Sequence, residues 1–442
     1  MNQAQSIRAE DLQDFRKRFS QDPMSHVATR AVSKCSIHDI CYDAERAKNI
    51  SHQFSLDLQT MNAANQKNSG RCWIFAGMNL LREKIARELN LEEFELSQNY
   101  ISFYDHLEKA NSFLERIIET ASEPLEDRYI SKILTYPVGD GGWWEYFVGL
   151  CRKYGVVPKE SMPETRQSTD TEPMNALLNM QLRRDAVQLR RAHQSGKSDD
   201  EIQALKKEML CRVYRLLAIC LGTPPQIFDF EYVDKDHAYH ADRDLTPLEF
   251  YNRYLGRDLS QIVSIMNAPI PEAPFHHTYV VSREESIHNA FHSKRLNLPM
   301  AEFKAAVLRQ LQDGDPVWFV CDCDYYFSME EGIWDPELYD YETLFGLDLA
   351  MEKGDLLEYR QCTLNHAMLL TGVNLVDGRP DKWKIQNSWG TEKGNQGYFV
   401  MSDAWFDRYV FTASIDQKYL TDAQRVQFSE EPVDLPLWSV LA

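Results

Sequence analysis

Helical and strand patterns occupy separate parts of this chain, and their order limits the folds open to it. From Cys72 onward, Ile74, Met78 and Leu81 begin an apolar pattern at helical spacing, and helical patterns continue to about residue 222. The last third instead contains short runs rich in Val, Ile, Phe and Trp, bounded by Gly and Asp: PVWFVCDC, HAMLLTGVNLV, KWKIQNSWG and GYFVMSDAWF. Helices followed by strands predict an α+β fold, in which a helical half faces an antiparallel sheet or barrel.

Composition and charge argue against several classes of protein. The chain has a net charge of −19, from 67 acidic and 48 basic residues, and such a surface disfavours binding to nucleic acid. No apolar stretch approaches the length of a membrane span. The first residues lack a signal-peptide pattern and the nine cysteines form no CxxC pair, so we expect reduced thiols and a cytoplasmic protein. No metal or cofactor motif occurs, and we expect neither group.

One stretch, NQKNSGRCWIFAG from Asn65 to Gly77, places a cysteine at the start of the first clear helix. A thiol nucleophile needs a lowered pKa, and the unpaired amides of a helix N-terminus favour the thiolate. Cys72 is therefore a candidate nucleophile. Gln66, six residues earlier, could donate its side-chain amide to an oxyanion.

The partners of such a thiol lie far along the chain. His366, in LNHAMLLTGV, begins a strand pattern and could act as general base and then general acid. Asn387, in IQNSWG, ends another strand pattern and could hold the imidazole in one orientation. Two strands of one sheet would bring these side chains together, and Trp389 could shield their hydrogen bond from water.

Each of these residues also has a less specific interpretation. Taken alone, His366 is an ordinary strand residue and Asn387 is a turn residue. His106 and His240 have no companions and are expected at the surface or at helix caps. A cysteine is most often a small buried hydrophobe, and we expect this of Cys35, Cys41, Cys151, Cys211, Cys220 and Cys362.

The combination of motifs resembles one known family. NQKNSGRCWIFA closely resembles the active-site cysteine segment of the bleomycin hydrolase and aminopeptidase C family, which consists of papain-like cysteine peptidases. Other segments resemble that family in the same order, over roughly residues 15 to 420: LSQNYISFYDHLEKANSFLE, DGGWWEYFVGLCRKYGVVPK, DLTPLEFYNRYL, NHAMLLTGV, KWKIQNSWG and GYFVMSDAWF. The resemblance implies a papain-like fold with helical insertions.

The resemblance also implies a role for individual residues. Cys72 would be the nucleophile, His366 the base and acid, and Asn387 the orienting residue. Gln66 and the Cys72 amide would form the oxyanion hole. Gly141 and Gly142 resemble glycines that hydrogen-bond a substrate backbone in extended conformation. The full set of candidate substrate-binding residues is Gly141, Gly142, Asn365, Trp389 and Ala442.

The resemblance divides the chain into five segments. They are an N-terminal arm and assembly segment at 1–61, a papain-like helical half at 62–172, a helical insertion at 173–300, a papain-like β half at 301–420 and a C-terminal arm at 421–442. It further implies a homohexamer with active sites facing an inner chamber. The C-terminal arm would enter the active-site cleft, where the carboxylate of Ala442 would pair with the α-amine of a peptide substrate.

Two departures from the family pattern concern the substrate cleft. The aminopeptidases of the family usually end in Trp-Asp-Pro-x-Gly-Ala-Leu-Ala, whereas Trp438 is followed only by Ser-Val-Leu-Ala. An arm three or four residues short would place its carboxylate on the order of 10 Å short of the usual stop, unless the preceding loop reaches further. Trp143 stands where a Gln commonly follows the Gly pair, and it would either alter the substrate pocket or pack against the helical half.

The expected function is hydrolysis of small peptides by a Cys-His-Asn thiolate mechanism with an acyl-enzyme intermediate. The short arm leaves two alternatives open, an endopeptidase and a peptidase that releases di- or tripeptides. An inactive, peptide-binding hexameric scaffold is the alternative from another class of function.

Overall fold

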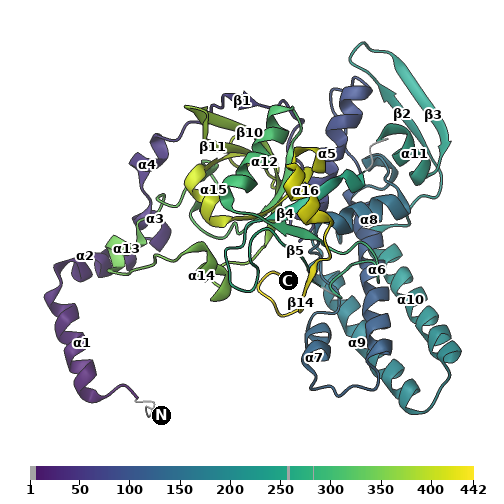
Figure 1. The fold of residues 1–442 in the computed structure, drawn as a ribbon, viewed down its shortest axis with the longest axis horizontal. Coiled ribbons are helices and arrows are strands. Elements are labelled where there is room, and N and C mark those ends of the chain that lie inside the picture. The colour runs from purple at the N-terminus through teal and green to yellow at the C-terminus, as the bar shows by residue number, and fades with distance from the viewer. Residues whose placement is uncertain (1–5, 256–258, 282) are drawn as a thin grey trace.

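Helices and strands lie in different parts of the computed structural model, which describes residues 6–255, 259–281 and 283–442. The long helices α6 (Gln98–Glu119), α9 (Glu172–Gln194) and α10 (Asp199–Leu221) stand together on one side, and the large sheet lies beside them (Figure 1). This arrangement confirms the predicted α+β fold with a helical half.

Sixteen α-helices and three 3₁₀ helices lie in the described residues. The other α-helices are α1 (Ala9–Gln21), α2 (Pro23–Val32), α3 (Ile37–Cys41), α4 (Ala44–Lys48), α5 (Cys72–Glu88), α7 (Arg128–Thr135), α8 (Trp144–Tyr154), α11 (Pro247–Tyr254), α12 (Met300–Gln312), α13 (Tyr341–Phe345), α14 (Lys353–Glu358), α15 (Asp403–Tyr409) and α16 (Asp422–Ser429). The 3₁₀ helices are Lys159–Ser161, Leu259–Gln261 and Gln417–Tyr419.

Most strands belong to one large sheet. The strands are β1 (Leu56–Asp57), β2 (Phe228–Val233), β3 (Tyr239–Leu245), β4 (Ile262–Met266), β5 (Thr278–Val281), β6 (Arg295–Asn297), β7 (Val317–Cys321), β8 (Phe327–Ser328), β9 (Ile333–Trp334), β10 (His366–Val376), β11 (Arg379–Gln386), β12 (Tyr398–Ser402), β13 (Val410–Asp416) and β14 (Val433–Leu435). The central order β4-β13-β7-β10-β11-β12 is antiparallel, as predicted. Parallel pairs lie outside it, between β4 and β6, β5 and β14, and β9 and β12, and the sequence did not predict them.

The predicted helix and strand boundaries hold with one correction. Helix α10 lies within the segment predicted to be helical, and Ser198 caps it in a capping box with Glu201. Helix α5 ends before Asn90, whose positive φ of 55° ends the helical path. The segment GYFVMSDAWF is only partly a strand, because Ser402 accepts a hydrogen bond from the Trp405 amide and caps α15.

The start of β10 and the end of β11 are adjacent, and this adjacency brings two of the candidate catalytic residues together. These strands pair antiparallel with Leu369 opposite Gln386. The first residue of β10, His366, and the residue after β11, Asn387, therefore lie at the same edge of the sheet. Helix α5 packs on β10, so its N-terminus faces this edge from the helical half.

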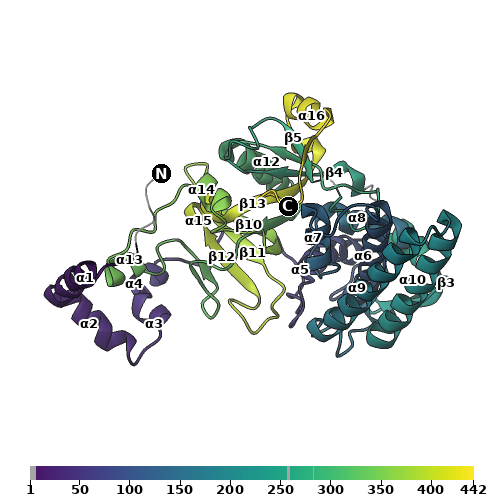
Figure 2. The same ribbon diagram turned by 90° about the horizontal axis from the view of Figure 1, so that it is seen from below.

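The two ends of the chain lie in different surroundings. Helices α1 and α2 extend away from the sheet, as both views of the ribbon show (Figures 1 and 2), whereas Ala47 of α4 packs in a cluster with Ile333 of β9 and Val400 of β12. The C-terminus lies between the sheet and the helical half. The last residues are only partly extended, since β14 pairs with β5 and a turn follows in which the Ser439 amide donates to the Pro436 carbonyl. The five-segment division of the chain stays a prediction.

Candidate active site

Cys72 is the first residue of helix α5 and lies against the start of β10. The Ala367 N–H donates a hydrogen bond to Cys72 Sγ at 3.4 Å. The preceding residue, Arg71, is buried and bonded through Nη2 to Glu164 at 2.8 Å, which fixes the chain as it enters the helix. The thiol therefore has one backbone donor from the β half and the unpaired amides of a helix N-terminus on its own side.

His366 and Asn387 meet at the sheet edge, as the sequence predicted. His366 Nε2 lies 2.9 Å from Asn387 Oδ1, and both side chains are buried. Asn387 Oδ1 also accepts the Ser388 N–H, so this atom is an acceptor and Nε2 carries the proton. Because Nε2 is occupied, Nδ1 is the nitrogen of the neutral ring that can accept a proton from a thiol.

Trp389 covers the imidazole, also as predicted. Its ring stacks on that of His366, with 5.0 Å between centroids and 20° between planes. An indole face beside the ring excludes water from the His366–Asn387 hydrogen bond and strengthens it.

Gln66 is buried in the turn before α5 and is bonded to the β half. Its Oε1 accepts the Ser388 hydroxyl at 2.5 Å, and its backbone N–H donates to the Ser388 carbonyl at 2.8 Å. One hydrogen of Nε2 goes to the Ser69 carbonyl at 2.5 Å. The second Nε2 hydrogen has no partner within the described residues, so the amide can still donate to an oxyanion. Sequence reasoning missed Ser388, although it directly follows Asn387 in the motif.

Burial acts on the two reactive groups in opposite directions. It raises the pKa of the Cys72 thiol to about 11, which corrects the lowered pKa expected from the sequence, although the Ala367 and Trp73 amides act in the other sense. It lowers the pKa of His366 to about 4, although the Asn387 hydrogen bond acts against this. Each group alone is therefore neutral near neutral pH. A proton can pass from the thiol to the imidazole without adding net charge to the buried site, and the resulting anion faces the N-terminus of α5.

Gly141 and Gly142 lie next to the start of α5. An added Cβ at Gly142 would come within 2.6 Å of the Trp73 ring, whereas none of the described atoms lies within 4 Å of the corresponding position at Gly141. The Gly141 carbonyl accepts a hydrogen bond from Lys109 Nζ at 2.6 Å. The N–H and C=O of Gly142 have no hydrogen-bond partner in the described part of the chain. Gly142 thus has free backbone groups beside the thiol helix, and substrate binding by this pair stays a prediction.

The other two predicted substrate-binding residues have defined surroundings. Asn365 Nδ2 donates to Asp322 and Asp324, each at 2.9 Å, and Asn365 Oδ1 accepts the Cys323 N–H. The amide therefore holds this acidic loop, and a contact with substrate stays a prediction. Ala442 is exposed at the surface, and its carboxylate forms no ion pair among the residues described.

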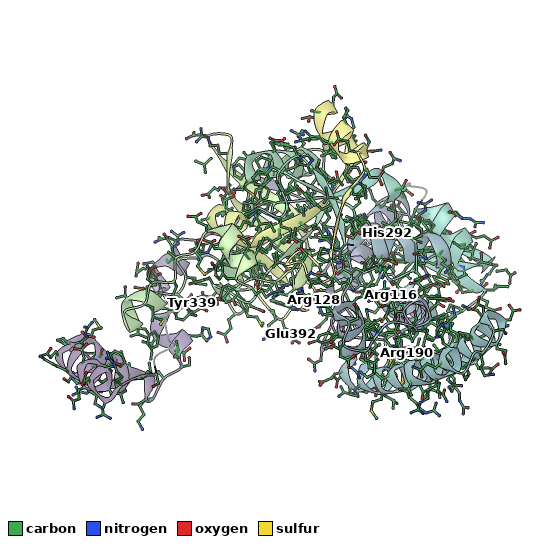
Figure 3. The ribbon with its side chains drawn as sticks, turned by 60° about the horizontal axis from the view of Figure 1, so that its bottom comes forward. Arg116, Arg128, Arg190, His292, Tyr339 and Glu392 are labelled. Carbon is green, nitrogen blue, oxygen red and sulfur yellow. The ribbon has the colours of Figure 1, made fainter. Side chains whose placement is uncertain are left out.

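The C-terminal residues are held from both halves of the molecule. Arg360 Nη2 donates to the Trp438 carbonyl at 3.0 Å. Arg128, labelled in Figure 3 on the helical half, places its guanidinium carbon 4.3 Å from the centre of the Trp438 ring. The carbonyl of Leu441, which is 2% exposed, accepts from Arg295 Nη1 at 2.8 Å.

Trp143 links this C-terminal segment to the glycine pair. The Arg295 guanidinium carbon lies 3.8 Å from the centre of the buried Trp143 ring. The contacts run from Leu441 to Arg295, then to Trp143 and to Gly142, which lies against Trp73. The end of the chain therefore lies on the Gly142 side of Cys72, and Arg295 and Trp143 lie between Leu441 and Gly142.

His106 is buried, which corrects the expectation that it lies at the surface. Its Nδ1 is 2.7 Å from the Ser102 carbonyl, and its Nε2 is 3.2 Å from Asp140 Oδ1. Burial alone would lower the pKa of His106, but the Asp140 carboxylate raises it. Asp140 Oδ2 accepts the Gly70 N–H at 2.8 Å, and its carbonyl accepts Trp73 Nε1. This pair fixes the turn before Cys72 to the glycine segment, and no sequence motif indicated it.

Two of the cysteines expected in the core are exposed instead. Cys35 lies in the turn after α2, and Cys211 lies on α10 between the buried positions Met209 and Val213, outside the apolar stripe. All nine cysteines are free thiols.

The described residues contain no group of three or more His, Cys, Asp or Glu side chains that could hold a metal ion. In the same residues no helix combines the length and apolar character that crossing a membrane requires. The expected cytoplasmic location and the absence of nucleic-acid binding stay predictions.

Comparison with known proteins agrees with this geometry. Residues 6–442 match the model of the Peptidase C1-like family. Aminopeptidase C of Lactobacillus helveticus is 39% identical over 438 residues, which cover 98% of each chain. Aminopeptidase C of Listeria monocytogenes is 42% identical over 429 residues, or 97% of each chain. The crystal structure of PepW from Lactobacillus rhamnosis HN001 superimposes with a TM-score of 0.97, at 40% identity, over 99% of this chain and 98% of that one.

The fold and these similarities define a papain-like cysteine peptidase. The chain belongs to the Peptidase C1-like family, in its bleomycin hydrolase and aminopeptidase C branch, as the sequence motifs predicted.

Proposed function

We propose that this protein is an aminopeptidase that removes residues from the amino end of small peptides by a Cys-His-Asn mechanism. The observation that carries the proposal is the meeting of α5 with β10, where the Ala367 N–H donates to Cys72 Sγ while His366 is bonded to Asn387. The aminopeptidases of Lactobacillus helveticus and Listeria monocytogenes support the same reaction class.

In the first step the thiol of Cys72 gives its proton to His366 Nδ1 and the sulfur attacks the carbonyl carbon of the substrate. A carbon–sulfur bond forms, and the carbonyl oxygen becomes an oxyanion. The Cys72 N–H and Gln66 Nε2 donate to that oxyanion. The imidazolium is held by Asn387 Oδ1, which accepts from Nε2 and keeps Nδ1 directed at the reacting atoms.

In the second step the carbon–nitrogen bond breaks and His366 Nδ1 gives its proton to the leaving amine. The acyl group remains on Cys72 as a thioester. Water then attacks the thioester carbon, passing one proton to Nδ1, and the carbon–sulfur bond breaks. The proton returns to sulfur, which restores the neutral thiol and imidazole.

The end of the chain supplies a reason for acting on a free amino terminus. Its last residues are held on the Gly142 side of Cys72 by Arg295, Arg128 and Arg360. A carboxylate without an ion pair at this place would attract the α-ammonium group of a peptide, and the bulk of the segment would stop the peptide from extending further. An endopeptidase and a peptidase that releases di- or tripeptides remain the alternatives to this function, because the C-terminal arm is short.

Deleting residues 439–442 is expected to relax this selectivity. The ratio of kcat/KM for an aminoacyl fluorogenic substrate to that for its N-acetylated form should fall by about tenfold or more, because the terminal carboxylate moves to Trp438, away from the position of Ala442. Ala442→Gly is the matched control, since it keeps the carboxylate and should keep the ratio. A wild-type enzyme that cuts N-acetylated peptides internally, at rates equal to free-amine peptides, would favour the endopeptidase reading instead.

We further propose that the chain assembles into a homohexamer through its projecting N-terminal arm. Leu12, Phe15 and Phe19 lie on one face of α1, and the two Phe side chains are 54% and 53% exposed. Helix α2 adds Met24 and Val27, which are also exposed. An apolar face of this extent on a projecting helix indicates a contact with another chain.

The double substitution Phe15→Glu and Phe19→Glu is expected to dissociate the hexamer. Both side chains are exposed in the single chain, so the change should not disturb its fold. Size-exclusion chromatography with light scattering should give six chain masses for the wild type and a smaller species for the variant. Lys17→Glu, on the opposite face of α1, is the control. A monomeric wild type would contradict the assembly.

A further inference from the structure

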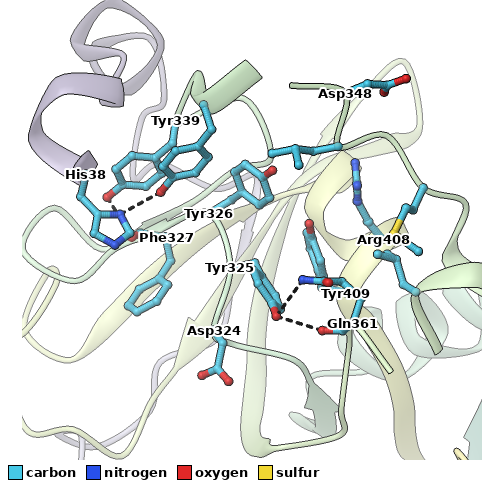
Figure 4. Close-up of a pocket in the computed structure, with 14 residues that line it drawn as sticks. His38, Asp324, Tyr325, Tyr326, Phe327, Tyr339, Asp348, Gln361, Arg408 and Tyr409 are labelled. Atoms are coloured by element: carbon cyan, nitrogen blue, oxygen red, sulfur yellow. Dashed lines mark hydrogen bonds between the residues drawn. The ribbon is translucent and has the colours of Figure 1, made fainter. Parts of the chain in front are cut away.

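A cavity of about 430 Å³ lies between the N-terminal arm and the sheet edge that holds His366. Its walls are mainly aromatic, and Figure 4 shows the rings around the opening. Tyr339, also labelled in Figure 3, lies where the arm meets the body. The rings that matter here are Tyr325, Tyr326, Tyr339, Tyr341 and Tyr409. The volume and the apolar lining are those of a site for a small organic ligand.

Strand register places this cavity beside the catalytic histidine. His366 on β10 lies opposite Cys321 on β7, and Cys321 lies opposite Val410 on β13. Two strand spacings separate His366 from Val410, so their Cα atoms are about 10 Å apart. Arg408 and Tyr409, which line the cavity, directly precede Val410. An extended peptide spans that separation with about three residues.

Side chains make a second connection between the cavity and the site. Phe327 lines the cavity, and its ring lies 6.2 Å from that of Trp389, which stacks on His366. Asp324, at the same wall, accepts from Asn365, the neighbour of His366. The cavity thus lies on the His366 and Trp389 side of Cys72, whereas the chain end lies on the Gly142 side. His366 gives its proton to the leaving amine, so this is the side of the leaving group.

Arg408 lines the cavity, and its guanidinium carbon lies 5.6 Å from the centre of the Tyr409 ring. Its guanidinium forms no ion pair and no hydrogen bond in the described part of the chain, and its Nε is buried. The acidic groups of the lining, Asp324 and Asp348, are bonded elsewhere, Asp324 to Asn365 and Asp348 to the Ala350 amide. A buried guanidinium donor without an acceptor is costly, and a carboxylate satisfies it through two parallel hydrogen bonds.

We infer that this cavity binds the carboxyl end of a short peptide substrate, with a large apolar side chain on the tyrosines and the terminal carboxylate on Arg408. The inference rests on the proposed aminopeptidase function, whose leaving group is the shortened peptide. The distance to His366 fits a leaving group of about three residues. The substrate class is therefore peptides of about four residues with a free, apolar carboxyl-terminal residue, and a tripeptide would reach the cavity less well.

The test compares Ala-Ala-Phe and Ala-Ala-Ala-Phe as free acids with the same peptides as C-terminal amides. Release of the first Ala is followed by chromatography. For the peptide that the wild type cleaves faster, kcat/KM of the free acid should exceed that of the amide by about tenfold or more. Arg408→Met should bring this ratio close to one. Arg215→Met, at an exposed position of α10 without a bonded partner among the described residues, is the control and should keep the ratio.

The possible outcomes separate this inference from the function on which it rests. Equal hydrolysis of acids and amides by the wild type overturns the carboxylate site and leaves the aminopeptidase standing. Failure to release Ala from any of these peptides defeats the proposed function itself. The amide Ala-Ala-Phe-Asp-NH2, which has only a side-chain carboxylate, is a further substrate in the test. If its kcat/KM equals that of the free acids, the cavity binds a side-chain carboxylate and the assignment to the terminal carboxylate is wrong. The wild-type ratios decide the matter even if Arg408→Met does not fold.

Discussion

Replacing Cys72 by Ala is expected to lower kcat/KM for aminoacyl substrates by about 10⁵-fold or more. In the proposed mechanism the sulfur forms the covalent bond to the acyl group, and no other described thiol lies at the start of α5 against β10. In enzymes whose nucleophile and base act as a unit, loss of the nucleophile removes nearly all of the rate that the unit supplies. Kinetics with a fluorogenic aminoacyl substrate, on protein freed of wild-type contamination, measures the loss.

Cys211→Ala is the control for this variant, because Cys211 is an exposed thiol on α10. It should retain wild-type kcat/KM. Substantial activity of Cys72→Ala, together with loss of activity in a variant of another cysteine, would assign the nucleophile elsewhere.

Replacing His366 by Gln is expected to lower kcat by about 10⁴-fold or more while KM changes little. Gln can still donate to Asn387 Oδ1, but it cannot accept the thiol proton or return it to the leaving amine. A group that acts only in the transition state affects kcat rather than ground-state binding. His193→Gln, at an exposed position of α9, is the matched control and should leave both constants unchanged.

The pH profile of the wild type gives an independent check of the base. Burial lowers the pKa of His366 to about 4. Below that pH the ring is an imidazolium and cannot take the thiol proton, so kcat/KM should fall as the pH decreases through about 4 and stay level towards neutral pH. A single loss of activity centred at the ordinary histidine pKa, about 6.5, would contradict the buried, neutral ring.

The proposed catalytic positions could be predicted from the sequence because their requirements are local. A helix start at Cys72 and strand patterns that begin at His366 and end before Asn387 are visible as periodicities. Antiparallel pairing of these neighbouring strands then places His366 and Asn387 at the same edge of the sheet. The same periodicity predicted helical structure to about residue 222, and α10 ends at Leu221.

What the sequence did not indicate depends on contacts between distant segments. The ion pair of His106 with Asp140 joins α6 to the glycine segment, and nothing near either residue signals it. The parallel pairing of β14 with β5 is set by tertiary packing, and no local pattern encodes it. Arg295 gave no motif either, because its importance comes from Trp143 and the distant Leu441. Cys211 is exposed because its position on α10 faces away from the buried side of the helix. The general preference of cysteine for burial does not tell which side of a helix a given cysteine occupies.

The assignment of Cys72 as the nucleophile, activated by His366, is tested most directly by mapping the site of covalent labelling. Wild-type protein is treated with a thiol-directed peptidyl epoxide. Its intact mass is measured by mass spectrometry, and the protein is then digested to locate the adduct. We predict one adduct, on Cys72, formed before any on the exposed Cys35 and Cys211, in step with loss of activity and greatly slowed in His366→Gln. Inactivation with Cys72 unmodified and the adduct on another cysteine would contradict the assignment.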